Sequence, residues 1–159
     1  MKLLDQAPAK IEAVIPGARG GLRILIIDDD AQMRAVLRTI LERADHAVLA
    51  AETGTQGLAM ALQQQPDIII CDVGLPDVSG HMVLKKLHSD YQTRTIPFIF
   101  VTGCVEKQSI RRGMAAGAAE YIAKPFRPED LGEAIAACRR KLAWYDQVLA
   151  PLGGRQRCA

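Results

Sequence analysis

The stretch LRILIIDDD, residues 22 to 30, joins a mostly apolar run to three consecutive aspartates. Four further short apolar runs follow along the chain, and three of the five are apolar throughout. A run without polar alternation is typical of a strand whose two faces are both covered, as in a parallel sheet between helices. The pattern therefore predicts a buried parallel sheet whose first strand ends in carboxylates.

Longer amphipathic stretches alternate with these runs. Strands are expected at residues 22–27, 47–50, 68–71, 98–101 and 121–123. Helices are expected at residues 31–44, 54–64, 81–87, 106–116 and 128–149. The alternation predicts an α/β fold with a doubly wound five-stranded parallel sheet, five flanking helices and an extended C-terminal helix.

Composition limits the function classes. The 159 residues are 49% hydrophobic, which is enough for one domain with a real core. Twenty Lys and Arg against eighteen Asp and Glu give a formal charge of +2. This balance argues against a general nucleic-acid or membrane surface, so no direct nucleic-acid or membrane partner is expected.

The chain divides into three expected parts: an N-terminal arm at 1–21 that is rich in proline and glycine, a central domain at 22–142, and a helix extension with a tail at 143–159. No stretch has the length and apolarity of a signal peptide or a membrane span, which predicts a cytoplasmic protein. Of the four cysteines, Cys71, Cys104 and Cys138 are expected to be reduced core thiols.

Polar side chains follow four of the predicted strands. Asp28 and Asp29 follow the first, Asp72 the third, Thr102 the fourth and Lys124 the fifth. Ligands of doubly wound sheets bind beyond the carboxyl ends of the strands, so these residues should share one pocket. Three crowded carboxylates repel one another unless a cation lies among them, and oxygen ligands favour magnesium over zinc.

This combination suits phosphoryl chemistry. A carboxylate beside such a metal can attack phosphorus, while the metal neutralises charge on the transferring group. Lys124 supplies a second cation and Thr102 a hydroxyl for a phosphoryl oxygen. Gly103 leaves room for that group and for backbone N–H donors.

Four short motifs, each at the end of a predicted strand, resemble the receiver domains of response regulators, which have a flavodoxin-like fold. The motifs are IDDD at 27–30, DVGLPDVSG at 72–80, VTG at 101–103 and KPF at 124–126. Any one of them is weak evidence, but four in the correct order are specific. The resemblance spans roughly residues 22–142.

The resemblance implies that Asp72 accepts a phosphoryl group from a histidine kinase or phosphotransfer protein. It implies that Asp28, Asp29, Asp72 and the backbone carbonyl of Gly74 hold Mg²⁺ or Mn²⁺. Lys124 and Thr102 would assist a self-catalysed transfer and dephosphorylation, so the chain would not be an enzyme in the ordinary sense. The peptide bond between Lys124 and Pro125 would be cis.

The resemblance also implies a switch formed by Thr102 and Tyr121. The Tyr121 ring would turn inward when the Thr102 hydroxyl moves toward the phosphate. This movement would remodel the face made by the last strand and the two last helices, and so bind a downstream protein or output domain. Two acidic residues often precede this aromatic in receivers that dimerise through that face. Here Ala119 and Glu120 stand there, which argues against the usual dimer.

Other interpretations stay open at this point. Asp28 and Asp30 have the spacing of a haloacid-dehalogenase-like phosphohydrolase, although Asp30 also suits a helix cap. The chain could instead be a degenerate receiver that only binds partners, or a fragment of a longer regulator with an output domain. His46, His81 and His88 lack metal-ligand spacing and are expected to pack or face solvent.

The last helix carries a heptad-like seam. Its members are Leu131, Ile135, Cys138, Leu142, Tyr145 and Leu149. A helix of this length exceeds the sheet it covers, so Leu142, Tyr145 and Leu149 should be exposed. The seam predicts a homodimer through this helix or a signalling helix toward an output domain. The alternatives are that the helix folds back or that Trp144 and its neighbours pack on the N-terminal arm.

Overall fold

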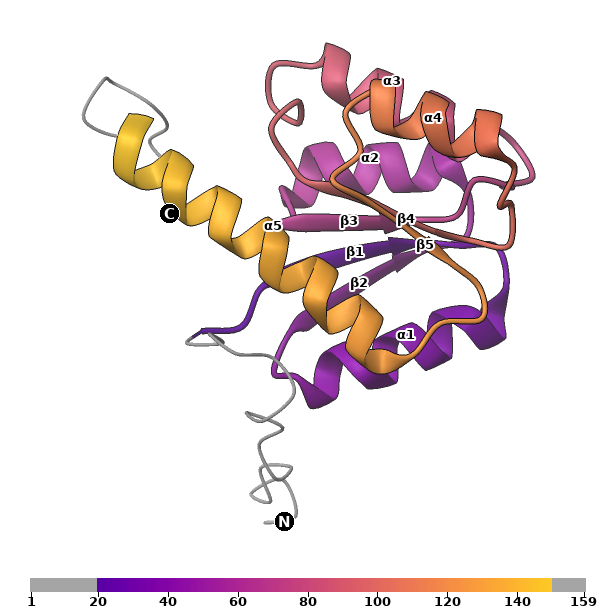
Figure 1. Cartoon of the computed structure of the whole chain (residues 1–159), viewed down its shortest axis with the longest axis horizontal. Coiled ribbons are helices and arrows are strands. Elements are labelled where there is room, and N and C mark those ends of the chain that lie inside the picture. Colours follow the sequence, from indigo (N-terminus) through magenta and orange to yellow (C-terminus); the bar gives the residue numbers. More distant parts are fainter. Residues whose placement is uncertain (1–19, 150–159) are drawn as a thin grey trace.

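A computed structural model of the chain describes residues 20–149. Five parallel strands form one sheet in the order β2-β1-β3-β4-β5 (Figure 1). The strands are β1 (Arg23–Ile27), β2 (Ala47–Ala51), β3 (Ile68–Cys71), β4 (Phe98–Thr102) and β5 (Glu120–Ala123). The predicted fold class is confirmed, and every strand begins and ends within one residue of its expected bounds.

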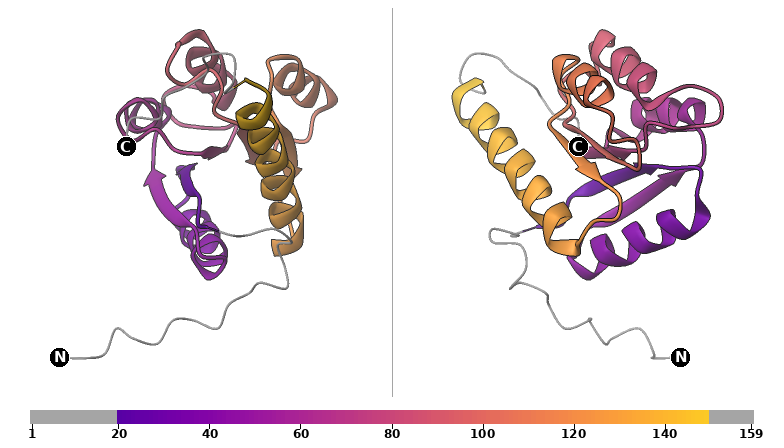
Figure 2. Two further views of the ribbon diagram at one scale, coloured as in Figure 1. Left: turned by 90° about the vertical axis from the view of Figure 1, so that its left-hand side faces the viewer. Right: turned by 45° about the vertical axis from the view of Figure 1, so that its right-hand side comes forward.

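Helices cover both faces of the sheet. They are α1 (Ala31–Arg43), α2 (Gly54–Gln64), α3 (Gly80–Ser89), α4 (Lys107–Ala115) and α5 (Pro128–Leu149). Figures 1 and 2 show α1 and α5 on one face and the other three helices on the opposite face. Alternate residues of β1 enter the two cores, since Ile26 packs with Leu41 and Leu131, whereas Leu25 and Ile27 pack with the α2 and α3 side.

Side-chain caps fix where three helices begin. Asp30 accepts hydrogen bonds from the backbone N–H groups of Gln32 and Met33, which confirms its expected role as the cap of α1. Thr53 caps α2 and Ser79 caps α3 in the same way. Each cap satisfies backbone donors that the first helical turn leaves unpaired. The helices that carry the strand-end loops therefore start at fixed points.

The cysteine predictions are mostly confirmed within the described residues. Cys71 and Cys138 are buried free thiols, and burial raises the pKa of Cys138 to about 11. Cys104 is only half-buried, so its prediction as a core thiol is wrong. It lies in the loop after β4, where the chain leaves the sheet.

Helix α5 extends past the sheet, as expected from its 22 residues (Figure 1). The first half of its seam is core, because Leu131, Ile135 and Cys138 are buried. Tyr145 is 52% exposed as predicted, but Leu142 is half-buried and its predicted exposure is wrong. Leu142 is one turn beyond Cys138, where the helix has not yet left the core. The Leu149 side chain lies outside what the structure describes.

The first described residue, Gly20, is bonded to α5, whose last residue ends the described chain. The guanidinium of Arg139 donates a hydrogen bond to the Gly20 carbonyl at 2.8 Å. Most of the arm expected at residues 1–21, and the tail after 149, lie outside the described residues. Between residues 20 and 149, no helix is both long and apolar enough to cross a bilayer.

Candidate functional site

The register of the sheet brings the strand-end residues together. Ile27 of β1 pairs with Cys71 of β3, so Asp28 and Asp72 are the next residues along two neighbouring strands. The backbone N–H of Asp72 donates to the Ile27 carbonyl at 2.9 Å, which extends the pairing by one step. The two carboxylates therefore start from adjacent points on one edge of the sheet.

Lys124 reaches the same edge from β5. Thr102 pairs with Ala123, and the N–H of Lys124 donates to the Thr102 carbonyl at 2.9 Å. The peptide bond between Lys124 and Pro125 is cis, as expected. The ammonium donates to Asp28 Oδ2 at 2.8 Å and to Asp72 Oδ2 at 3.1 Å. One cation thus bridges the two carboxylates.

The environment of this bridge is largely closed to water. The side chains of Asp28, Asp72 and Lys124 are 2%, 14% and 19% exposed. Burial lowers the pKa of Lys124, but the hydrogen bonds that its ammonium donates to both carboxylates outweigh it and raise that pKa above its ordinary value. Lys124 therefore stays charged at physiological pH.

Asp29 completes an acidic cluster with Asp28 and Asp72. The three residues offer carboxylate oxygens that all lie within 4.8 Å of one another. Asp29 is exposed at the rim, while Asp28 is buried. A single ammonium cannot balance three carboxylates, and hard oxygen donors are the ligands that Mg²⁺ binds best. The residues therefore fit a small divalent cation.

The space beside the cluster is open. A Cβ built at Gly74 or at Gly103 would meet no described atom within 4 Å. Both glycines belong to loops that follow strands ending at the site, and both are exposed. A ligand can therefore approach the cluster from the side of these two loops.

Thr102 and Tyr121 both contact the backbone of Cys104. The Thr102 hydroxyl is buried and accepts from the Cys104 N–H at 3.1 Å. The Tyr121 hydroxyl donates to the Cys104 carbonyl at 2.6 Å, and its ring lies 5.4 Å from that of Phe100. Partial burial raises the pKa of Tyr121, so its hydroxyl keeps its proton. The loop after β4 therefore connects the two predicted switch residues.

Sequence reasoning missed Asp77, which anchors the loop after Asp72. Its carboxylate accepts from the N–H groups of Gly54 and Thr55 at 2.9 and 2.8 Å, and from the Thr55 hydroxyl at 2.5 Å. At the other end of the loop, a Cβ at Gly80 would lie 2.2 Å from the Asp72 carbonyl oxygen. The loop is therefore fixed to the N-terminus of α2 and packed closely beneath α3.

Arg34 was also missed. Its guanidinium donates to the Asp28 carbonyl at 2.8 Å and to Glu52 at 3.2 Å. These bonds join α1, the end of β1 and the end of β2 around the acidic cluster. An arginine on a helix is ordinarily solvated, so its spacing from Asp28 gave no signal of this contact.

The structure argues against the phosphohydrolase alternative, because the residue that would be its general acid has another role. Asp30 would have to protonate a leaving group, yet its carboxylate is occupied as the cap of α1. Asp28 would have to attack phosphorus, yet it is buried and bonded to Lys124. Asp72 is also bonded to Lys124 but is more exposed than Asp28, so Asp72 is the better placed of the two to attack phosphorus.

Comparisons with known proteins agree with this geometry. The family model described as response regulator receiver domain matches residues 24–136. The chain is 38% identical over 126 residues to the DNA-binding dual master transcriptional regulator RpaA of Synechocystis sp., a match that covers 79% of this chain and 51% of that protein. It is 36% identical over 115 residues to protein PilH of Pseudomonas aeruginosa, covering 72% of this chain and 95% of PilH.

Solved structures agree as well. A CheY-like receiver domain protein from Methanospirillum hungatei JF-1 superposes with a TM-score of 0.71 at 33% identity, covering 80% of this chain and 98% of that one. A putative response regulator from Chloroflexus aurantiacus J-10-fl superposes with a TM-score of 0.71 at 31% identity, and the match covers 75% of this chain and 98% of that one. The chain spans about half the length of RpaA, and likewise of the PhoB regulator of Pseudomonas aeruginosa, of which it covers 53%.

Proposed function

This chain belongs to the response regulator receiver domain family, and on that premise we propose that Asp72 is its phosphoacceptor. The family has a signalling role in two-component systems rather than that of an ordinary enzyme. The observation that carries the proposal is the single ammonium of Lys124, bonded to both Asp28 and Asp72. It orients the Asp72 carboxylate at the open end of the sheet.

In the proposed transfer a carboxylate oxygen of Asp72 attacks phosphorus. The new O–P bond forms as the bond from phosphorus to the donor's histidine nitrogen breaks, and that nitrogen keeps the electron pair. Lys124 neutralises charge on the phosphoryl oxygens, and the Thr102 hydroxyl is available to donate to one of them. The same groups would support self-catalysed loss of the phosphoryl group to water.

Asp28, Asp29, Asp72 and the carbonyl of Gly74 are the groups that would hold the cation, which we propose to be Mg²⁺ or Mn²⁺. The support is the close approach of the three carboxylates with one neighbouring ammonium. When bound, such a cation neutralises the charge that develops on the transferring phosphoryl group.

We further propose that Thr102 and Tyr121 form the switch. Both bond the backbone of Cys104, so movement of Thr102 toward a phosphoryl group would break the contact that holds the loop. The face formed by α4, β5 and α5 would then change and bind a downstream protein or an output domain. A histidine kinase or phosphotransfer protein would be the donor, and a cytoplasmic location remains a prediction of the sequence.

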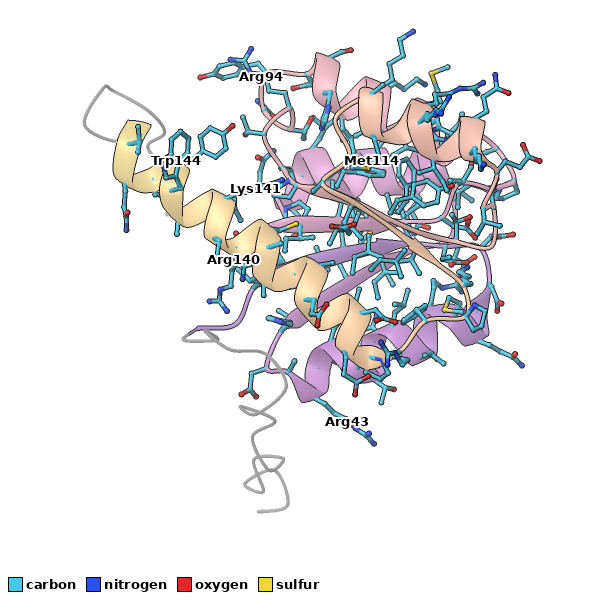
Figure 3. The ribbon with its side chains drawn as sticks, in the orientation of Figure 1. Arg43, Arg94, Met114, Arg140, Lys141 and Trp144 are labelled. Atoms are coloured by element: carbon cyan, nitrogen blue, oxygen red, sulfur yellow. The ribbon has the colours of Figure 1, made fainter. Side chains whose placement is uncertain are left out.

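The proposed division is a receiver at 22–142 with an arm before it and a helix extension after it. The exposed aromatic side chains Trp144 and Tyr145 support a homodimer or a signalling helix formed by the end of α5. Figure 3 shows Trp144 near the end of α5 that extends beyond the sheet.

Labelling with a small phosphodonor tests the central proposal. The protein is incubated with acetyl phosphate and Mg²⁺ and weighed intact; one labile phosphoryl group should appear, and Asp72→Asn should abolish it without unfolding. Asp45→Asn, the same change at an exposed turn of the opposite sheet edge, should label normally. Full labelling of Asp72→Asn contradicts the assignment. Absence of labelling in the unmodified protein indicates a degenerate receiver, and rapid turnover of unrelated phosphate esters indicates the hydrolase.

A further inference from the structure

The loop of residues 73–79 follows the proposed acceptor, and the Asp77 carboxylate ties it to helix α2. One carboxylate oxygen accepts from the Gly54 N–H at 2.9 Å, and the other accepts from the Thr55 N–H at 2.8 Å. The second oxygen also accepts from the Thr55 hydroxyl at 2.5 Å. One exposed side chain thus makes three hydrogen bonds to residues that lie 22 and 23 positions earlier in the sequence.

The first turn of α2 favours a carboxylate at this point. Its backbone N–H groups have no partner inside the helix, and the helix dipole places partial positive charge there. The side chain of Thr53, the N-cap, accepts from the Gln56 N–H at 3.1 Å. The N–H groups of Gly54 and Thr55 are bonded by Asp77 instead. The start of the helix and the shape of the loop therefore depend on the same bonds.

Close packing reinforces this contact. A Cβ on Gly54 would lie 2.4 Å from Val78 Cγ2, so the glycine lets the start of α2 approach the loop. Val73, Leu75 and Val78 pack against the core on the α2 and α3 side of the sheet. The loop therefore presents its apolar side chains to the core, while Asp77 bonds the helix from the surface.

Gly74, the proposed carbonyl ligand, has little that holds it directly. It is exposed, and a Cβ there would meet no described atom within 4 Å. Its N–H donates to Asp72 Oδ1 at 3.2 Å, and this is the carboxylate that the proposed function uses for the cation and the phosphoryl group. That bond can change when Asp72 binds a ligand. The position of Gly74 therefore has to be fixed by its neighbours in the loop.

The neighbours of Gly74 are fixed on both sides. Before it, the Val73 carbonyl accepts from the Gly80 N–H at 2.8 Å, at the start of α3. After it, the three bonds of Asp77 hold the loop to α2. Only three residues separate Gly74 from Asp77 along the chain, so loss of the second attachment would free the segment that carries the Gly74 carbonyl.

We propose that Asp77 is a positioning residue whose bonds to α2 hold this loop in the shape in which the Gly74 carbonyl binds the divalent cation. The proposal rests on the proposed cation site and on the role given there to Gly74. A ligand group that is already held in place loses less conformational freedom when the ion binds. Without Asp77, the loss of freedom on ordering the loop opposes binding, so the affinity for the cation falls.

Titration calorimetry of the full chain with Mg²⁺ tests the proposal. Asp77→Ala removes all three bonds and should weaken binding roughly three- to tenfold, less than the loss of a group bonded directly to a metal ligand. Thr55→Val removes only the hydroxyl bond and leaves the charge near the site unchanged. It should weaken binding in the same direction by a smaller factor. In the double variant, Thr55→Val should add nothing to Asp77→Ala, because its bond is already lost.

The matched control is Thr53→Ala. It removes a cap from the same helical turn, but the bond that it removes lies within α2 and does not involve the loop. It should leave the Mg²⁺ affinity unchanged. If Thr53→Ala weakens binding as much as Asp77→Ala, the effect comes from the helix and the proposal is wrong. Unchanged affinity in Asp77→Ala contradicts it as well, and unchanged affinity in Thr55→Val assigns the effect of Asp77→Ala to its lost charge.

Nitrogen-15 relaxation of the metal-free chain gives a second readout that needs no cation. The Gly74 amide should gain motion on the picosecond to nanosecond timescale in Asp77→Ala but not in Thr53→Ala. Equal order at Gly74 in both variants and the unmodified chain overturns the proposal. If the unmodified chain binds no Mg²⁺, the proposed cation site fails, while the relaxation of Gly74 still decides whether Asp77 positions the loop.

Discussion

The ammonium nitrogen of Lys124 lies 3.1 Å from Oδ2 of Asp72, although 52 positions separate the two residues in sequence. The same nitrogen lies 2.8 Å from Oδ2 of Asp28, which is almost fully buried. Removing the ammonium would leave two neighbouring carboxylates without their common counter-charge.

Lys124→Met should therefore destabilise the metal-free protein by about 1–3 kcal/mol, because it keeps the length of the side chain but leaves carboxylates unpaired. Urea unfolding with a chelator present measures the change. Lys86→Met, on the exposed side of α3, should change the free energy of unfolding little. Equal stability of the two variants would show that the bridge contributes nothing.

Asp29→Ala should weaken Mg²⁺ binding by on the order of tenfold, since one of three nearby carboxylates is lost. Isothermal titration calorimetry measures the affinity. Glu42→Ala removes a carboxylate from the far end of α1, where it pairs with Arg38, and should bind Mg²⁺ normally. An unchanged affinity in Asp29→Ala would exclude Asp29 from the site.

Asp77→Asn should lower the free energy of unfolding at neutral pH. It should also remove the part of that free energy that is lost when the solution is acidified. Hydrogen bonds, first from the Thr55 side chain and then from backbone N–H groups, hold the pKa of Asp77 well below its ordinary value in the folded state. A depressed pKa stabilises the fold above the unfolded value of about 3.9, and this contribution is lost as pH falls below it.

The measurement is the urea midpoint at pH 6 and at pH 3. The gap between Asp77→Asn and the unmodified chain should narrow at the lower pH, whereas Asp45→Asn should track the unmodified chain at both. If the difference in urea midpoint between Asp77→Asn and the unmodified chain is the same at both pH values, the pKa of Asp77 does not change on folding.

His46 should make the fold less stable as pH falls through about 6.5, the ordinary pKa of histidine. The ring is 4% exposed and its Nδ1 accepts from the Leu22 N–H, so it must be unprotonated there. Burial, and then the charge of Arg139, lower its pKa in the folded state. The unfolded chain then binds more protons, and stability is complete above the unfolded pKa and declines below it.

Thermal unfolding between pH 7.5 and 5 measures this slope. His46→Gln can still accept from Leu22 through its amide oxygen and should flatten the slope, while His88→Gln, at a half-buried position, should keep it. A slope of the same size in His46→Gln would assign the pH dependence to other groups.

The end of α5 should promote self-association, because Trp144, Tyr145 and Val148 are 57%, 52% and 41% exposed on the segment that extends beyond the sheet. Analytical ultracentrifugation should find a larger species for the full chain than for a version ending at Arg140. The full-length double variant Trp144→Ser, Tyr145→Ser should resemble the shortened chain. If the full chain and the shortened chain are both monomers, the proposed homodimer through α5 is wrong.

Sequence patterns predicted the parts of this protein that depend on local periodicity and strand ends. Buried strands such as β3 have no polar alternation, and parallel topology then brings Asp28, Asp72 and Lys124 to one edge. These positions were predictable because the sheet fixes where each strand ends, independently of the conformation of the loop that follows.

Contacts between loops and helix faces could not be predicted in this way. His81 was expected only to pack or face solvent, because its link to Ser109 depends on how closely α3 and α4 approach, which Gly113 permits. Asp77 bonds Thr55 across 22 positions, and nothing in either residue type specifies that partner. Such contacts follow from tertiary packing rather than from periodicity.

The hydrogen bond from Arg139 to Gly20 lies at the sheet edge where strands begin, opposite the acidic cluster. Helix α5 runs back along the sheet and continues past this point, so both ends of the described chain leave the domain far from Asp72 (Figure 1). Fluorescent proteins, affinity tags or surface-immobilisation handles fused directly before residue 20 or directly after residue 149 would leave the acceptor pocket accessible. A pair of fluorophores at the two ends would report movement of α5 relative to β1 without obstructing a donor protein.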